Sequence, residues 1–189
     1  MCGGQGTRLR PEIEGEKPLV EVGGRPMIDH VLEALRDSEI ETIHAAVSPS
    51  TPETAALLEP MADVHVVETP GEGYVADLGA AVDVVERPVV TVTADLPLLS
   101  GDHVDRLINQ YTGRSLSVCV PLAVAKRVLD SVETTVDHEG STVVPTGLNV
   151  VGQSDGGSHR LVRADKRLAL NVNRPADRRQ ADQWLSDSR

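Results

Sequence analysis

Residues 26–69 read PMIDHVLEALRDSEIETIHAAVSPSTPETAALLEPMADVHVVET, a stretch that alternates twice between a helical and a strand pattern. Apolar side chains recur at helical spacing over residues 26–38 and predict an amphipathic helix. Two short apolar runs, residues 42–48 and 64–69, predict buried strands, and residues 51–61 between them predict a second helix. This order of elements is typical of an α/β fold, in which helices cover a sheet.

The alternation continues further along the chain. We expect a helix over residues 74–86, a strand over residues 88–95, a helix over residues 100–111 and a strand over residues 116–121. The Val-rich run of the first of these strands suits burial on both faces. Together the elements predict a Rossmann-like, mostly parallel sheet with helices on both faces, folded as a single domain over residues 1–189.

The pattern changes in the last part of the chain. Residues 134–152 have the character of a hairpin, and residues 153–159, rich in Gly and Ser, predict a loop. Residues 167–173 form an apolar run that predicts a strand, and residues 175–188 predict a closing helix.

The charge balance restricts both function and source. The formal net charge is −11, so a broad electrostatic surface for nucleic acid is not expected. The chain has 15 Arg and 3 Lys against 29 Asp and Glu, and an acidic, lysine-poor surface suits a solvent of very high salt. A halophilic archaeal source is therefore the preferred interpretation, and an ordinary acidic protein from a GC-rich genome is the alternative.

The chain carries no pattern of a membrane or secreted protein. No stretch approaches the ~20 apolar residues that a membrane span needs, and no charged-then-apolar signal peptide is present. Cys2 and Cys119 have no metal-binding or CxxC spacing, which suggests reduced thiols in a cytoplasm.

A glycine-rich loop stands at the start of the chain, formed by Gly3, Gly4, Gln5, Gly6, Thr7 and Arg8. It matches neither the P-loop pattern nor the dinucleotide-binding pattern. Glycines let backbone N–H groups turn toward a polyphosphate, and Arg8 would add a bidentate donor, with Lys17 following in the same region. The alternative interpretation of the loop alone is a flexible tail.

Asp95 is the last residue of the predicted Val-rich strand and lies in the segment TADLPLL. A carboxylate in that position suits a hard cation such as Mg²⁺, which prefers one or two carboxylates together with phosphate oxygens. Asn171 and Asn173 end the last predicted strand, and their carbonyl oxygens could complete the metal shell or hold a ribose. The alternative roles are a turn or helix cap for Asp95 and an N-cap for Asn173.

The segments GGQGTRL, EKPLVEVGGRPMIDHV, TADLPLL and NVNRPADR follow one another in this order. The combination resembles the nucleotidyltransferase superfamily that activates sugars, molybdopterin and related phosphates. Residues 48–54, 68–82 and 144–152 sharpen the resemblance to the archaeal GTP:adenosylcobinamide-phosphate guanylyltransferase family, over nearly the whole chain. Molybdopterin enzymes would show a Gly-Pro-Leu-like segment where this chain has GEGYVAD, so they rank second.

The resemblance implies transfer of GMP from GTP to adenosylcobinamide phosphate, with release of pyrophosphate, in cobalamin biosynthesis. Asp95, aided by Asn173, would hold Mg²⁺ on the phosphate oxygens and stabilise the developing charge. The amides of residues 4–6, together with Arg8 and Lys17, would hold the β- and γ-phosphates. No general base is expected, because a phosphate monoester is largely ionised near pH 7.

Further residues are candidates for contact with the guanine base or the corrinoid. Ser48 to Thr51 and the backbone near Gly71–Gly73 would contact the base. Gly147 would allow close approach of base or corrinoid, with a simple turn glycine as the alternative. Asp77 would face the site from its helix, with a solvated position as the alternative.

The resemblance also bears on the start of the chain. In the family, residues equivalent to Met1 and Cys2 close the first, central strand, which this sequence lacks. We therefore expect a translation start some ten residues upstream, with Met1 an internal methionine.

Three other functions remain open from the sequence. They are a molybdenum cofactor guanylyltransferase, a sugar-1-phosphate nucleotidyltransferase, and a regulatory protein that binds nucleotide without catalysis. The joint presence of Lys17, Asp95 and Asn173 argues against the last. A homodimer is the expected assembly.

Overall fold

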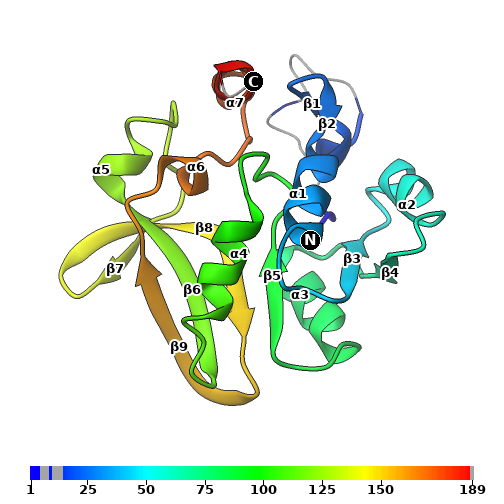
Figure 1. The fold of residues 1–189 in the computed structure, drawn as a ribbon, viewed down its shortest axis with the longest axis horizontal. Helices are drawn as coiled ribbons and strands as arrows, with labels where there is room; N and C mark the ends of the chain where they lie inside the picture. The colour runs from blue at the N-terminus through cyan, green and yellow to red at the C-terminus, as the bar shows by residue number, and fades with distance from the viewer. Residues whose placement is uncertain (5–8, 10–14, 188–189) are drawn as a thin grey trace.

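The computed structural model describes residues 1–4, 9 and 15–187. Gln5, Gly6, Thr7 and Arg8 lie outside the described residues, so their expected role in phosphate binding stays a prediction. Figure 1 shows an α/β arrangement in which the N-terminus lies in the interior of the fold, close to β3 and β5. The sequence correctly predicts the α/β class.

The first part of the chain confirms the predicted alternation of helices and strands. Helix α1 buries the apolar face that its spacing predicts, and α2 begins directly after Thr51. In chain order the elements are the 3₁₀-helix η1 (Lys17–Leu19), β1 (Glu21–Val22), β2 (Arg25–Pro26), α1 (Met27–Arg36), β3 (Ile43–Val47), α2 (Pro52–Leu58), β4 (Val64–Glu68), α3 (Tyr74–Asp83), β5 (Val89–Val92) and α4 (Gly101–Ile108).

The second part confirms the hairpin and the closing helix. Strands β7 and β8 pair antiparallel through the turn at Glu139 and Gly140, both of which have positive φ. The remaining elements are β6 (Arg114–Pro121), α5 (Leu122–Ala125), β7 (Val136–His138), β8 (Ser141–Val151), β9 (Ser154–Val162), α6 (Lys166–Ala169) and α7 (Pro175–Asp187).

Two predicted elements are wrong in this part of the chain. Residues 153–159 do not form a loop: most of them belong to β9, which pairs with β6, so backbone pairing outweighs the weak strand propensity of Gly and Ser. Residues 167–173 do not form a strand. Asp165 caps the short helix α6 by accepting the N–H of Arg167, and the apolar run that follows is buried by side-chain packing without strand pairing.

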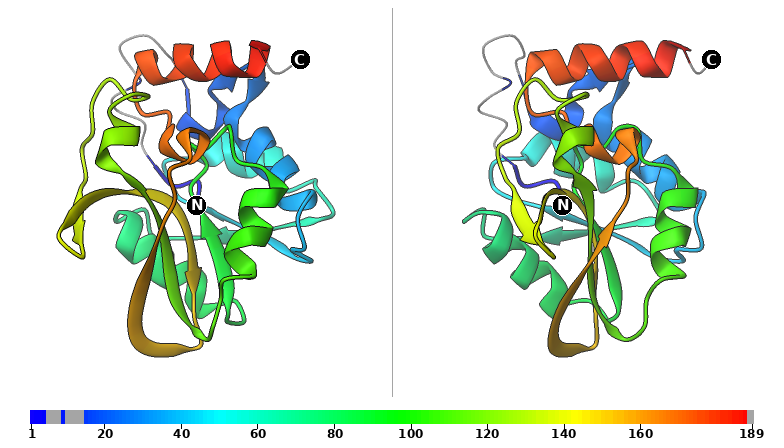
Figure 2. Two further views of the ribbon diagram at one scale, coloured as in Figure 1. Left: turned by 60° about the vertical axis from the view of Figure 1, so that its left-hand side comes forward. Right: turned by 90° about the vertical axis from the view of Figure 1, so that its left-hand side faces the viewer.

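The strand pairing is mixed rather than uniformly parallel. Strands β3 and β4 pair in parallel, as do β6 and β9. Strand β8 runs antiparallel to β5, β6 and β7, because it returns from the hairpin between two strands of the opposite direction. The order of the larger sheet is β5-β8-β6-β9, and helices α3 and α4 lie on opposite sides of it (Figure 2).

Met1 and Cys2 bridge the β3–β4 sheet and the larger sheet that contains β5. The Met1 N–H₃⁺ donates to the C=O of Val92 over 2.9 Å, and the Met1 C=O accepts from Ala94 over 3.1 Å, which is the pattern of a parallel strand pair. On the other side, the Cys2 N–H donates to the C=O of Ala46 over 2.7 Å. These two residues therefore lie between β5 and β3.

An apolar groove of about 760 Å³ continues from Met1 between the same two strands. Its walls include residues of β3, β5 and α3, among them Ile43, Val90 and Leu78. The strand expected ahead of Met1 lies outside the sequence and stays a prediction.

The core is aliphatic, as a chain without Phe requires. Leu32, Leu58, Leu96, Leu107 and Leu148 are among its fully buried side chains. Within the described residues, no helix combines the length and the apolar character that crossing a membrane demands.

Candidate active site

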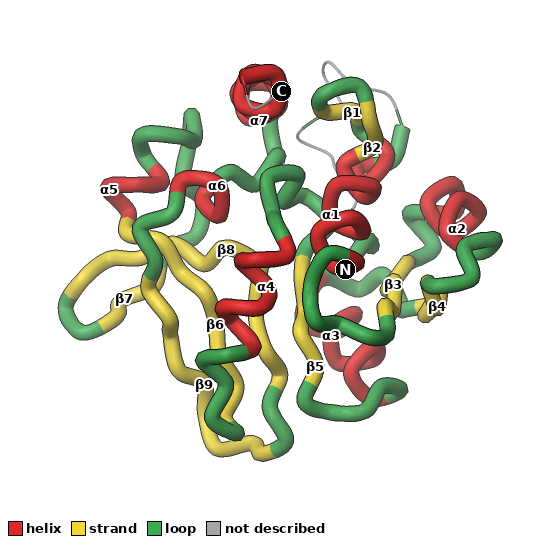
Figure 3. Tube along the Cα trace, in the orientation of Figure 1, coloured by secondary structure: helices red, strands yellow, loops and turns green. Residues whose placement is uncertain are grey.

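Three segments that are far apart in the chain meet at the carboxyl end of β5. Asp95 follows β5, Lys17 opens η1, and Asn171 and Asn173 lie between α6 and α7. Figure 3 draws the loop that joins α6 to α7 in green. The backbone joins two of these segments, because the N–H of Val172 donates to the C=O of Asp95 over 2.9 Å. Polar side chains thus gather at the end of a strand, where α/β folds bind their ligands.

The Lys17 ammonium connects η1 to both of these segments. Its Nζ lies 2.6 Å from Oδ2 of Asp95 and 2.6 Å from Oδ1 of Asn173. The side chains of Lys17 and Asp95 are only 16% and 13% exposed, so solvent screens this ion pair less than a surface pair. The structure therefore brings together Lys17, Asp95 and Asn173, which the sequence predicts as one constellation. Arg8, the remaining predicted catalytic residue, is outside the described residues.

Asp95 is held as a carboxylate. Burial by itself raises the pKa of this carboxyl, but the charge of Lys17 and hydrogen bonds from Lys17 and Asn171 outweigh burial and lower the pKa below its usual value. Asn171 donates from Nδ2 to Oδ1 of Asp95 over 3.0 Å and to the C=O of Thr146 over 2.9 Å. One carboxylate oxygen is thus fixed by Asn171, and the other faces Lys17.

One oxygen of Asp95 and one of Asn173 are suitable ligands for a hard divalent cation. Oδ2 of Asp95 and Oδ1 of Asn173 converge on one positively charged group, the Lys17 ammonium, which stands in the position of a cation. One carboxylate and one amide oxygen, completed by phosphate and water, make a donor set that Mg²⁺ accepts. The described part of the chain has no cluster of three His, Cys, Asp or Glu side chains, so a cage made only of such ligands is absent there.

A cleft of about 480 Å³ opens beside this cluster. Lys17 and Asp95 line one part of it, and the loop Gly71–Gly73 lines another. The described residues Gly3 and Gly4 of the predicted phosphate loop also line the cleft. Gly3, Gly4, Lys17 and Asp95 therefore share one cavity.

Asp77 lines this cleft from α3, and its side chain is buried. Its Oδ1 accepts the N–H of Gly71 over 2.7 Å, which fixes the glycine turn. A Cβ built at Gly3 would lie 3.2 Å from Oδ2 of Asp77 and 3.2 Å from Cβ of Ser48, so the backbone at Gly3 packs closely on both residues.

Ser48 lies behind Gly3 and does not line the cleft. Its N–H bonds to Oγ1 of Thr51 over 3.0 Å, and its Oγ donates to the C=O of Gly3 over 3.2 Å. The N–H and the hydroxyl of Ser48 are thus engaged by Thr51 and Gly3. The expected role of Ser48 in recognition of the base stays a prediction.

A close contact within the protein requires glycine at position 147, apart from the ligand contact that the sequence predicts. The φ of Gly147 is +87°, and a Cβ built there would lie 2.4 Å from Oγ1 of Thr93. The absent side chain makes room for Thr93 of the chain itself, next to Asp95, and Gly147 does not line the cleft. Close approach of a ligand to Gly147 therefore stays a prediction.

Glu16 is a candidate positioning residue that sequence reasoning missed. Its carboxylate accepts the N–H of Glu53 over 2.6 Å and the N–H of Thr54 over 2.7 Å at the first turn of α2, and Oγ1 of Thr54 donates to it as well. This anchor fixes the backbone directly before Lys17. Its proximity to Lys17 was visible in the sequence, but the contact with α2 depends on the fold.

Known proteins match both the sequence and the fold. A family model described as "MobA-like NTP transferase domain" matches residues 1–129. The adenosylcobinamide-phosphate guanylyltransferase of Methanocaldococcus jannaschii is 28% identical over 193 residues, which cover 98% of this chain and 95% of the relative.

Two solved structures share the fold at low sequence identity. One is a hypothetical transferase from Thermus thermophilus, with a TM-score of 0.69 and 17% identity over 94% of this chain and 96% of that one. The other is a putative glucose-1-phosphate thymidylyltransferase from Bacillus anthracis, with a TM-score of 0.68 and 15% identity over 98% of this chain and 93% of that one. With the family match over residues 1–129 and the cluster of Lys17, Asp95 and Asn173, the conclusion is that this chain belongs to the family of MobA-like NTP transferase domains.

Proposed function

We propose that this protein transfers GMP from GTP to adenosylcobinamide phosphate and releases pyrophosphate, as a step of cobalamin biosynthesis. The observation that carries the proposal is the convergence of Lys17, Asp95 and Asn173 within 2.6 Å contacts beside a cleft lined by Gly3 and Gly4. The choice of acceptor rests on similarity over 98% of the chain to a relative named for that acceptor.

The reaction joins two anions, so the site must neutralise charge. Mg²⁺, bound by Asp95 and Asn173, would supply the positive charge that offsets the α-phosphate as it is attacked. Lys17, Arg8 and the amides of residues 4–6 bind the β- and γ-phosphates and orient pyrophosphate as the leaving group. An oxygen of the acceptor phosphate attacks the α-phosphorus and the bond to the β-phosphate oxygen breaks, without a general base.

The base would be bound on the side of the cleft formed by the loop Gly71–Gly73. The N–H groups of Glu72 and Gly73 can donate to guanine O6, and a carboxylate such as Asp77, whose Oδ1 already accepts the N–H of Gly71, can accept from N1–H and the 2-amino group through Oδ2. Ser48 and Gly147 remain candidates for contact with the base or the corrinoid. The acidic, lysine-poor composition supports a halophilic archaeal source, and the two isolated cysteines support a cytoplasmic location.

Pyrophosphate release tests the proposal. The protein is incubated with Mg²⁺, with GTP, ATP or CTP, and with adenosylcobinamide phosphate, molybdopterin or a sugar 1-phosphate. We expect release only with GTP and adenosylcobinamide phosphate, and Asp95→Asn should abolish it. Release with only molybdopterin or only a sugar 1-phosphate would replace the proposed acceptor. Tight GTP binding without release for any acceptor would indicate a regulatory nucleotide-binding protein.

A further inference from the structure

The Lys17 ammonium lies where the proposed function requires a metal ion. It is 2.6 Å from Oδ2 of Asp95 and 2.6 Å from Oδ1 of Asn173, the two oxygens assigned to Mg²⁺. An ammonium and a divalent cation cannot share these oxygens at that spacing, because like charges repel strongly in a partly buried site. Lys17 must therefore leave before a metal can bind to both residues.

We propose that Lys17 blocks the metal position in the nucleotide-free protein and that a bound nucleoside triphosphate draws Lys17 away, so that nucleotide and divalent cation bind cooperatively. The inference rests on the proposed function, because the metal position is the one assigned to Asp95 and Asn173 there. It adds an order of events to that function: the metal site opens only when phosphate oxygens are available to Lys17.

The charge balance favours this exchange. Without nucleotide, the positive charge of Lys17 neutralises the carboxylate of Asp95, so a divalent ion would meet no net negative charge from this pair. A triphosphate brings several negative charges into the cleft, which Lys17 lines. Both cations then have anionic partners: Lys17 the outer phosphates, and the metal Asp95 together with phosphate.

The local structure allows the side chain to move while its backbone stays fixed. A lysine carries its ammonium on a flexible four-carbon stem. Glu16, bound to the first turn of α2, and the buried Pro18 hold the chain on either side of Lys17. The exchange therefore requires a change of side-chain rotamer and no movement of η1.

Binding of Mn²⁺ without nucleotide tests the inference, with electron paramagnetic resonance to measure the free ion. The variants are Lys17→Gln, Asp95→Asn, the double variant Lys17→Gln/Asp95→Asn, and Lys126→Gln as the control. Lys126 is exposed at the end of α5, and its replacement changes the net charge by the same amount. We expect Lys17→Gln to bind Mn²⁺ roughly tenfold more tightly than the unaltered protein. Lys126→Gln should show no gain, and the double variant should lose the gain.

A second titration adds the α,β-methylene analogue of GTP, which cannot release pyrophosphate. The analogue should increase the affinity for Mn²⁺ more in the unaltered protein than in Lys17→Gln, because in the variant the site is already open.

The outcomes separate the inference from the proposed function. Equal Mn²⁺ affinity of the unaltered protein and Lys17→Gln without nucleotide would overturn the inference. If the analogue then still promotes Mn²⁺ binding that depends on Asp95, the metal site of the proposed function stands. If Asp95→Asn leaves Mn²⁺ binding unchanged even with the analogue, the proposed function loses its metal site, and the inference fails with it.

Discussion

The Lys17 ammonium and the Asp95 carboxylate are 2.6 Å apart, although 78 positions separate them in the chain. The contact links η1 to the end of β5, and Asn173 adds the loop before α7 through its bond to the same ammonium. A triphosphate in the adjoining cleft would contact groups from all three segments. The fold thus builds one charged cluster from residues that have no local relationship.

Glu16→Ala should weaken the use of GTP without removing any group that contacts it. The substitution removes the acceptor for Glu53 and Thr54 and frees the backbone before Lys17. We expect kcat/KM for GTP to fall about 10- to 100-fold, chiefly through a higher KM, because Lys17 is no longer held in position.

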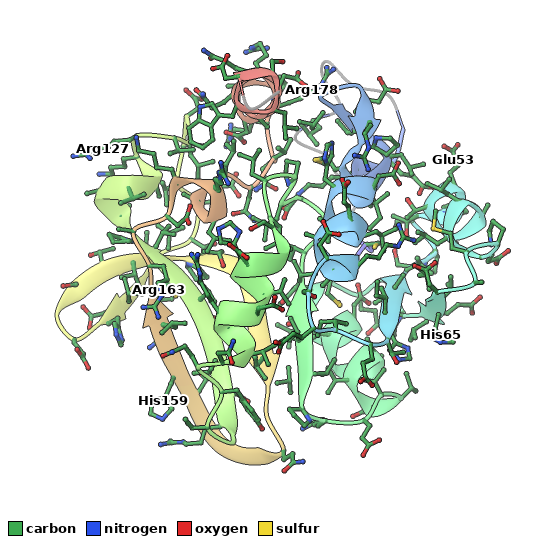
Figure 4. All side chains as sticks on the ribbon, viewed as in Figure 1. Glu53, His65, Arg127, His159, Arg163 and Arg178 are labelled. Atoms are coloured by element: carbon green, nitrogen blue, oxygen red, sulfur yellow. The ribbon has the colours of Figure 1, made fainter. Side chains whose placement is uncertain are left out.

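Glu53→Ala is the matched control for Glu16. Glu53 has the same charge and lies on α2 at the periphery of the molecule (Figure 4). Its substitution should leave steady-state kinetics close to those of the unaltered protein. If Glu53→Ala lowers kcat/KM for GTP as much as Glu16→Ala does, the cause is the loss of negative charge at α2 and not the anchoring of Lys17.

Gly147→Ala should destabilise the protein by about 2 to 4 kcal/mol. The new Cβ would meet Thr93 at 2.4 Å, and φ of +87° adds backbone strain. Gly140→Ala in the same hairpin has a φ of +76° but no atom within 4 Å of the new Cβ, so it isolates the strain. Urea unfolding should give a clearly larger loss for Gly147→Ala. Equal losses would mean that the contact with Thr93 costs nothing.

Protonation of His44 should weaken the fold as the pH falls. His44 and His65 are partners in the β3–β4 pair, with ring centroids 5.3 Å apart, and Figure 4 labels His65 near the edge of the molecule. Partial desolvation of the largely exposed His44 ring, followed by the charge of His65, lowers the pKa of His44. A lowered pKa means that the unfolded chain binds the proton more readily, so stability is lost as the pH falls through the ordinary histidine pKa near 6.5.

His65→Thr tests this dependence. Because the pair is exposed to solvent, we expect it to reduce the acid-induced loss of unfolding free energy between about pH 7.5 and pH 5 by only ~0.3 kcal/mol. The slope of unfolding free energy against pH, measured by urea titration, should be shallower in the variant. An identical slope would contradict repulsion between the two rings.

The groove between β3 and β5 should accept an added strand. Met1 already pairs in parallel with β5, and the groove of about 760 Å³ continues from it. Extension ahead of Met1 by six Val- and Ile-rich residues should raise the midpoint of thermal unfolding, because the new strand would bury apolar surface and pair with both edges. An extension of equal length made of Gly and Ser is the control, and equal midpoints would contradict strand insertion.

Much of the fold was predictable because the first part of the chain repeats a strong pattern. The helical spacing of Val31, Leu32 and Leu35 and the Val-rich run of β5 leave little ambiguity. The errors at residues 153–159 and 167–173 arise where tertiary pairing and packing outweigh local propensity.

The site was predictable in part for a different reason. Lys17, Asp95 and Asn173 stand in motifs that resemble a known family, and residue type alone suggests their chemistry. The roles of Glu16 and Asn171 depend on which segments meet in space. The contact of Gly147 with Thr93 likewise follows from the β5–β8 register, which one sequence does not reveal.

A crystal structure with Mg²⁺ and the α,β-methylene analogue of GTP tests the central claim most directly. It should show the metal bonded to oxygens of Asp95 and Asn173, and the Lys17 ammonium on the outer phosphates. Nucleotide bound away from this cleft, or metal bound elsewhere while Lys17 stays on Asp95, would contradict the claim that these three residues form one metal–nucleotide site.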